Sequence, residues 1–362
     1  MLGVDVNLSG VWRWHPVLGW TQRPGTGYEY RVDGELVRVQ FNSRGFRDVE
    51  HETAKPPGVK RIVLVGDSFC EALQVNLEDT FFHVLQRRLN EASRDGSRWE
   101  VVNLGVGDFG TAQELLALRQ YGLAYSPDLV LCQVFPLNDI GNNSLALATL
   151  YRSANDGYRP YFVLEDGGLR PASAQSLGGA LRCWLASFRL LERTLLAVRE
   201  RLARFDPAAD EAARRRRLER LGFPPLEPLL YTFVPEPEQI APVRDGWRVT
   251  ERCLEEMARL CASRGIPFGA VVIPYDAMVG PRWAEFAAQQ PPPAMDPAYP
   301  ERRLAALFDR LGVPHVAMRP VFEARLDEYL PCRDGHLGPS GHRLTAATLH
   351  ECLATAGLVP PP

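Results

Sequence analysis

The sequence predicts a parallel α/β sheet with helices on both faces. Three observations support this fold class: five short apolar runs typical of buried strands, helical periodicity between them, and polar or glycine-containing turns directly after several of the runs. Strands that alternate with helices favour a three-layer arrangement in which a parallel sheet is covered on both sides. A chain of 362 residues can hold such a core and an additional segment.

The predicted elements alternate from residue 61 onward. Each strand is short and apolar, as expected for strands buried on both faces of a sheet. The strands are Arg61–Gly66, Trp99–Leu104, Asp128–Phe135, Phe268–Ile273 and Val313–Met318. The helices are Asp79–Glu91, Ala112–Tyr125, 248–264, 300–311 and a last helix from its N-cap Ser340 to about Leu353.

A β-rich extension precedes this alternation. It covers residues 1–56, and the alternating pattern around Asp33-Gly34 predicts a β-hairpin within it. The main domain then covers 57–362.

An insertion at 144–247 interrupts the main domain. We expect it to be mainly helical, because a long helical pattern runs from about Leu177 to Ala203. Its arginine run 214–217 is typical of a solvated helix face. The insertion either forms a lid that excludes water or only shapes a substrate pocket, and the sequence leaves this choice open.

The composition argues against several classes of protein. A net charge of −3 and an isoelectric point near 6.2 disfavour a nucleic acid or a membrane surface as the main partner. No apolar run approaches the ~20 residues that span a bilayer, and the first residues lack the pattern of a secretion signal, so we expect a cytoplasmic protein. Seven cysteines without C-x-x-C spacing predict free thiols, and no pattern indicates a metal site or a cofactor.

A serine follows the first predicted strand. Ser68, in Gly66-Asp67-Ser68, lies at the carboxyl end of that strand, where open α/β sheets bind their ligands. Gly66 permits a sharp turn of the backbone there. The tripeptide alone is a weak signal, since a helix N-cap has the same composition.

Three further segments bring polar groups to the same edge of the predicted sheet. The glycine-rich turn 103–110 offers backbone N–H groups, Asn138 offers a side-chain amide, and His336 offers an imidazole two positions after Asp334. A nucleophile, a base with an orienting carboxylate and two oxyanion donors form a complete set for acyl transfer.

Neighbouring polar residues have simpler interpretations. We expect Asp67 to fix its loop and Asp139 to brace its turn. His342 competes with His336 for the role of base, but its position inside the last helix favours a packing role.

These four segments, in this order, resemble the four blocks of the SGNH (GDSL-like) hydrolase superfamily. The resemblance implies a flavodoxin-like three-layer sheet and a triad of Ser68, His336 and Asp334. It also implies an oxyanion hole made by the Ser68 N–H, a glycine N–H and the Asn138 amide. The segment Phe41-Asn-Ser-Arg-Gly-Phe-Arg47 also resembles the one that precedes the serine block in many bacterial members.

The sequence departs from the family pattern in three places. The family glycine usually lies five residues after the block-two asparagine; that position is Asp108 here, with Gly107 beside it, so either residue is a candidate donor. Pro136 stands where many members have glycine. The last block has Asp334-x-His336 instead of Asp-x-x-His, a spacing similar to that of O-acetyltransferase-like relatives.

The sequence therefore predicts a serine-dependent hydrolase of a small-molecule or glycan ester that acts through an acyl-enzyme. An O-acyltransferase would use the same residues with an alcohol in place of water. A non-catalytic binding protein on the same fold is the alternative from another class. The glycine-rich loop 105–110 lacks the lysine and the spacing of a phosphate-binding loop, which disfavours a nucleotide site.

Overall fold

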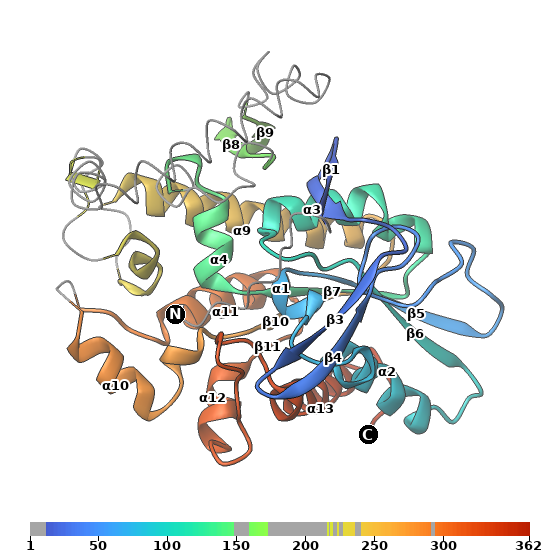
Figure 1. Cartoon of the computed structure of the whole chain (residues 1–362). Helices are drawn as coiled ribbons and strands as arrows, with labels where there is room; N and C mark the ends of the chain where they lie inside the picture. Colours follow the sequence, from blue (N-terminus) through green and yellow to red (C-terminus); the bar gives the residue numbers. More distant parts are fainter. Residues whose placement is uncertain are drawn as a thin grey trace.

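The computed structural model describes residues 12–147, 159–172, 216, 218–219, 223, 227–235, 240–290 and 294–362. Its centre is a five-stranded parallel sheet with the order β11-β10-β7-β5-β6 (Figure 1). The strands are β5 (Val59–Val65), β6 (Arg98–Asn103), β7 (Leu129–Val134), β10 (Phe268–Val272) and β11 (His315–Ala317). In chain order this is the 2-1-3-4-5 arrangement of flavodoxin-like sheets, which confirms the predicted fold class.

Helices cover both faces of the sheet (Figure 1). One face packs against α2 (Phe81–Ala92), α12 (Met318–Ala324) and α13 (Pro339–Thr355), and the other against α3 (Thr111–Gln120), α9 (Ala241–Ala262) and α11 (Tyr299–Leu311). Alternate residues of β5 supply the two cores: Ile62 and Leu64 belong to the first, and Val63 and Val65 to the second. The apolar character of every β5 position from Ile62 onward is thus explained by burial on both sides.

Two predicted elements are shorter in the structure. The last strand begins at His315 rather than Val313, because Pro314 has no N–H to donate to a ladder, and it ends where α12 begins at Met318. The predicted helix 112–125 ends as α3 at Gln120 and continues as a 3-10 turn, Gly122–Tyr125. A second 3-10 turn, Leu77–Asp79, precedes α2.

The N-terminal part forms two hairpins. The predicted one is β3 (Gly27–Val32) and β4 (Glu35–Gln40), and its turn residues Asp33 and Gly34 both have positive φ, as a tight hairpin turn requires. The other, β1 (Trp12–His15) with β2 (Gly19–Gln22), was not predicted. Trp20 of β2 is buried in the core that also contains α3 and α9.

The remaining described elements lie between or after the core strands. They are α1 (Ser68–Glu71), α4 (Pro136–Asn142), β8 (Phe162–Glu165), β9 (Gly168–Pro171), α10 (Pro281–Ala288) and the 3-10 turns Pro228–Phe233 and Asp276–Met278. The predicted helix Leu177–Ala203 and most of the arginine run 214–217 lie outside the described residues. The helix that begins at Ala241 starts within the segment predicted as an insertion.

Six cysteines are described, and all are free thiols: Cys70, Cys132, Cys253, Cys261, Cys332 and Cys352. Only Cys352 among them is not buried. Within the described ranges, none of the helices has both the length and the apolar character needed to cross a bilayer.

Candidate active site

A hydroxyl, an imidazole and a carboxylate form a row at the carboxyl edge of the sheet. The Oγ of Ser68, at the start of α1, lies 2.9 Å from Nε2 of His336. The Nδ1 of His336 lies 3.2 Å from Oδ2 of Asp334, an ion-pair distance at which the two groups are not aligned as a hydrogen bond. Ser68 and His336 are thus close in space although they lie 268 positions apart in the chain.

The loop that carries Asp334 fixes the carboxylate from two sides. The backbone N–H of His336 donates to Oδ1 at 3.1 Å, and Nε2 of Gln74 donates to Oδ2 at 2.7 Å. Partial burial raises the pKa of Asp334, but its contacts with His336 and Gln74 outweigh this and lower the pKa to about 2. The carboxylate is therefore ionised throughout the neutral range, although its side chain is 51% exposed.

Asp67 caps α1, the helix that begins at Ser68, and meets Asn138. Its Oδ1 accepts the N–H of Phe69 at 3.0 Å, and its Oδ2 accepts from Nδ2 of Asn138 at 3.0 Å. The second N–H of the same Asn138 amide donates to the carbonyl of Phe109 at 2.7 Å. Burial raises the pKa of Asp67 to about 6 against the lowering effect of these bonds. Asp67 thus has the loop-fixing contacts that were expected of it.

The glycine-rich turn after β6 is held from several directions. The N–H of Gly107 donates to Oε2 of Glu71 at 3.0 Å, so this amide already has an acceptor. Asp108 has a φ of +65°, in the left-handed region where glycine is favoured. Its carboxylate pairs with Arg159 at 2.9 Å, and its carbonyl accepts from the same guanidinium at 2.7 Å.

The other polar residues singled out in the sequence have structural contacts. Asp139 accepts the N–H of Phe135 through Oδ2 at 2.8 Å and so braces the start of α4. His342 accepts the N–H of Phe81 through Nδ1 at 3.1 Å and stacks on its ring. Burial lowers the pKa of His342 to about 3, so this imidazole stays neutral inside the core.

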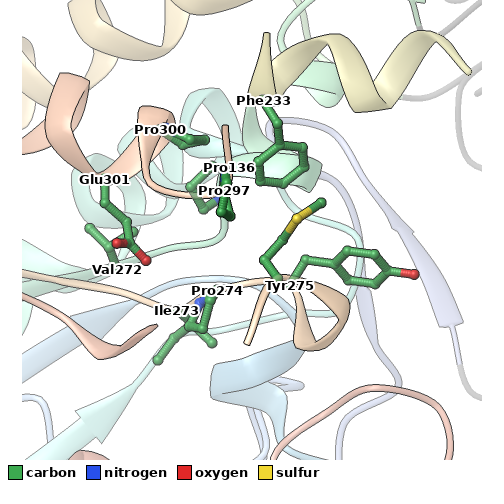
Figure 2. A pocket seen from close by; sticks show the side chains of 10 residues that line it. Pro136, Phe233, Val272, Ile273, Pro274, Tyr275, Pro297, Pro300 and Glu301 are labelled. Atoms are coloured by element: carbon green, nitrogen blue, oxygen red, sulfur yellow. The ribbon is translucent and has the colours of Figure 1, made fainter. Parts of the chain in front are cut away.

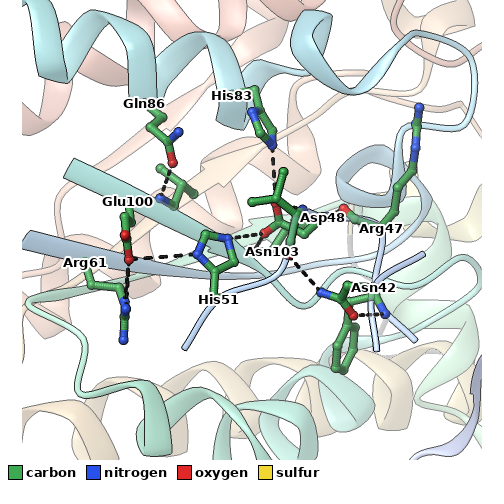
Figure 3. Close-up of polar contacts among 12 residues, drawn as sticks. Asn42, Arg47, Asp48, His51, Arg61, His83, Gln86, Glu100 and Asn103 are labelled. Carbon is green, nitrogen blue, oxygen red and sulfur yellow. Dashed lines mark hydrogen bonds and ion pairs between the residues drawn. The ribbon is translucent and has the colours of Figure 1, made fainter. Parts of the chain in front are cut away.

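The segment before β5 is anchored to the edge strand β6 (Figure 3). Asp48 accepts the backbone N–H of Asn103 at 2.7 Å and contacts His51 and His83 at 3.2 Å each. Nδ2 of Asn103 donates to the carbonyls of Arg47 and Cys70, while its Oδ1 accepts the N–H of Gly105. One buried amide side chain thus joins the N-terminal segment, α1 and the glycine-rich turn.

An apolar pocket lies at the carboxyl ends of β7 and β10, the same sheet edge that bears Ser68 (Figure 2). Among the described residues that line it, Glu301 is the charged one; its Oε2 accepts from Arg319 at 3.0 Å, and burial raises its pKa to about 7. The lining residues are Pro136, Phe233, Val272, Ile273, Pro274, Tyr275, Met278, Pro297, Pro300 and Glu301.

Several residues at this edge were not anticipated from the sequence. Glu71, Gln74 and Arg159 contact the loops that bear the predicted residues. For Glu71 a signal existed, because a carboxylate stands alone in the otherwise apolar or neutral run 69–75. Arg159 lies in the segment predicted as an insertion, where no local pattern indicated its partner.

In the sequence comparisons, no family model and no curated protein matched the chain. Solved structures with a similar fold include the lipase/acylhydrolase from Enterococcus faecalis, with 14% identity, a TM-score of 0.41 and coverage of 84% of this chain and 98% of that one. A protein from Desulfitobacterium hafniense assigned to the G-D-S-L family of lipolytic proteins has 13% identity and a TM-score of 0.39 over 81% and 99% of the two chains. A catalytic mutant of the acetylxylan esterase Axe2 from Geobacillus stearothermophilus has 10% identity and a TM-score of 0.41 over 81% and 94%. The order and direction of the strands, rather than these distant similarities, establish the fold of the chain.

Proposed function

We propose that this chain is a serine ester hydrolase of the SGNH type, with Ser68 as nucleophile, His336 as base and Asp334 as the residue that orients the base. The observation that supports this most directly is the 2.9 Å contact between the Ser68 hydroxyl and Nε2 of His336, with a carboxylate on the far side of the ring. A hydroxyl within hydrogen-bond reach of a base that is itself oriented is the arrangement of an activated nucleophile.

The reaction has two steps. His336 removes the Ser68 proton as the oxygen attacks the ester carbonyl, and the protonated imidazole then gives this proton to the departing alcohol. Water, deprotonated by the same imidazole, attacks the acyl-enzyme; the bond between the acyl group and Ser68 Oγ breaks, the imidazolium returns its proton to Oγ, and the acid is released. Asp334 keeps the proton of neutral His336 on Nδ1, so that Nε2 is free to accept, and it stabilises the imidazolium.

Three groups surround the position of the oxyanion. The N–H of Ser68 stands at the first position of α1, where a helix has no acceptor for it. Of the two neighbouring candidates we propose the N–H of Asp108; the N–H of Gly107 would first have to leave Oε2 of Glu71 to act as a donor. The Asn138 amide donates to Asp67 and Phe109 in the free protein, and one of these bonds gives way to the oxyanion when substrate binds.

An O-acyltransferase is the second candidate, and the Asp334-x-His336 spacing favours it. An alcohol would then replace water in the second step without any change in the residues. Hydrolysis is favoured by solvent exposure, since the His336 and Asp334 side chains are 25% and 51% exposed and water reaches them. Adding acceptor alcohols and measuring the ratio of new ester to free acid separates the two reactions.

The test of the nucleophile uses a fluorophosphonate probe and p-nitrophenyl acetate. We expect the wild type to be labelled and to hydrolyse the ester, Ser68→Ala to lose both, and His336→Ala to lose nearly all of both. Ser126→Ala, which changes a serine before the amino end of β7 and so at the sheet edge opposite Ser68, is the control and should behave like wild type. Equal labelling and equal hydrolysis by wild type and Ser68→Ala would refute the assignment and support a binding protein.

A further inference from the structure

The side chain of Glu71 connects three segments near Ser68: α1, the glycine-rich turn with Gly107, and strand β2. It is the last residue of α1, three positions after Ser68, and it is 2% exposed. One carboxylate oxygen, Oε2, accepts the N–H of Gly107 at 3.0 Å. The other, Oε1, accepts from Nε2 of Gln22 in β2 at 2.5 Å.

We propose that Glu71 is a positioning residue that holds the glycine-rich turn 103–110, with its proposed oxyanion donor, in place relative to Ser68. Through Gln22, strand β2 also helps to hold this turn. The inference rests on the proposed function of Ser68, because it assigns Glu71 a role in the same reaction. Glu71 acts through Gly107 and not on the substrate itself.

The second backbone group of Gly107 is also held from β2. Nε1 of Trp20 donates to the Gly107 carbonyl at 3.2 Å, so the N–H and the C=O of this peptide unit are both fixed by buried side chains. A Cβ at Gly107 would lie 2.6 Å from Oε2 of Glu71, a distance that real Cβ atoms do not tolerate. Glycine at this position therefore permits the close approach of the carboxylate, and the adjacent Asp108 peptide inherits the fixed position.

Packing alone does not account for a carboxylate at this position. Burying a carboxylate is costly unless a cation compensates it, and an apolar residue of similar volume would fill the same space. Arg47 is the buried cation nearby, but its guanidinium donates to the backbone carbonyls of Glu71, Ala72 and Val75. Among the described residues, the Glu71 carboxylate has neutral hydrogen-bond donors as its partners and no ion pair.

The contact tolerates either protonation state of Glu71. Burial raises the pKa of Glu71 to about 7 despite the bonds from Gln22 and Gly107 and the charges of Arg47 and His336. Tyr28 and Tyr30 also face it and are neutral, since their pKa values are raised. The Oε1 of Gln22 is buried without a partner, so a half-turn of this amide lets Oε1 accept a hydrogen bond from the O–H of neutral Glu71, while Oε2 of Glu71 keeps the Gly107 N–H.

A glutamine at position 71 should therefore reproduce the contact, because its oxygen accepts the Gly107 N–H and its NH₂ group donates to the rotated Gln22. A leucine should remove the contact. We expect Glu71→Leu to lower kcat for p-nitrophenyl acetate by about 10–100-fold with KM little changed, a partial loss compared with the ~10²–10³ of a deleted donor. Glu71→Gln should retain kcat within about threefold. Glu114→Leu is the matched control and should keep wild-type kcat. It also removes a fully buried carboxyl group, one that accepts from Sγ of Cys132 in β7.

A second readout does not depend on activity. Labelling valine with carbonyl ¹³C and glycine with ¹⁵N selects the Val-Gly peptide units, of which the sequence contains three, at Gly66, Gly107 and Gly280. The Gly107 amide resonance should move as the pH passes about 7 in the wild type and stay fixed in Glu71→Gln.

The outcomes separate this inference from the proposed function. Wild-type kcat in Glu71→Leu, a Glu71→Gln variant as slow as Glu71→Leu, or a Gly107 resonance at the same position in Glu71→Leu as in the wild type would each overturn it. If the wild type hydrolyses esters no faster than Ser68→Ala, the proposed function fails. The comparison of the Gly107 resonances would then still establish or exclude the contact with Glu71.

Discussion

Removing the Asn138 side chain tests two things at once: its proposed role as an oxyanion donor and its hydrogen bond to the buried carboxyl group of Asp67. In the free protein the Asn138 amide donates to Oδ2 of Asp67 at 3.0 Å and to the Phe109 carbonyl at 2.7 Å. Asn138→Ala deletes both bonds and leaves one oxygen of the fully buried Asp67 without this donor. The variant should therefore lose activity and stability for two separable reasons.

The two losses have different sizes. Deleting one oxyanion donor raises the barrier by about 2.7–4 kcal/mol, or about 10²–10³ in kcat. Leaving a buried acceptor unpaired costs about 1–3 kcal/mol of folding free energy. Because Asp67 loses a bond that stabilises its charged form, its pKa should also rise above its present value of about 6.

The assay compares kcat for p-nitrophenyl acetate with chemical denaturation of the same samples. Asn143→Ala is the control, because Asn143, the C-cap residue of α4, is also a buried asparagine, but its side chain bonds to Thr111, to Thr250 and to the N–H of Ala112. It should lose a similar folding free energy and little kcat. A kcat for Asn138→Ala within a few-fold of that for Asn143→Ala would refute the oxyanion role and leave only the structural one.

Two further predictions follow from the charged groups of the site and core. Asp334→Asn should lower kcat by about 10²-fold or more, yet less than the ~10⁴ of a fully buried triad carboxylate, because this side chain is half exposed; unchanged kcat would exclude an orienting role. Because the pKa of His342 falls from 6.5 in the unfolded chain to about 3 in the folded one, its contribution to stability is complete above pH 6.5 and is lost as the pH falls toward 3. Urea denaturation should thus show a smaller stability loss between pH 7 and pH 4 in His342→Gln than in the wild type, and parallel losses would contradict the assignment.

The sheet could be predicted from the sequence because its strands are buried on both faces. Each apolar run is continuous, so its burial does not depend on any particular partner, and the positions of the loops after the strands follow from the parallel arrangement. Ser68, Asn138 and His336 could be placed at one edge for this reason. The first hairpin was missed, because β1 and β2 are four residues each and lack a glycine–asparagine turn signal.

The contacts that hold the site could not be predicted in the same way. The sequence left both Gly107 and Asp108 as candidates, and it did not indicate that the Gly107 amide donates to Glu71. Gln22 meets Glu71 across 49 positions of the chain, and Gln74 meets Asp334 across 260. Such pairs depend on how loops and hairpins fold over the sheet edge, and no local periodicity encodes them.

The buried thiols have a practical consequence for covalent chemistry on this protein. Burial raises the pKa of Cys261 and Cys332 to about 12 and that of Cys70 and Cys132 well above the ordinary range. Because the thiolate is the reactive form, these side chains are poor targets for electrophiles near neutral pH. Warheads that also attack cysteine, such as β-lactones and carbamates, should therefore react with the Ser68 hydroxyl in preference to these four thiols.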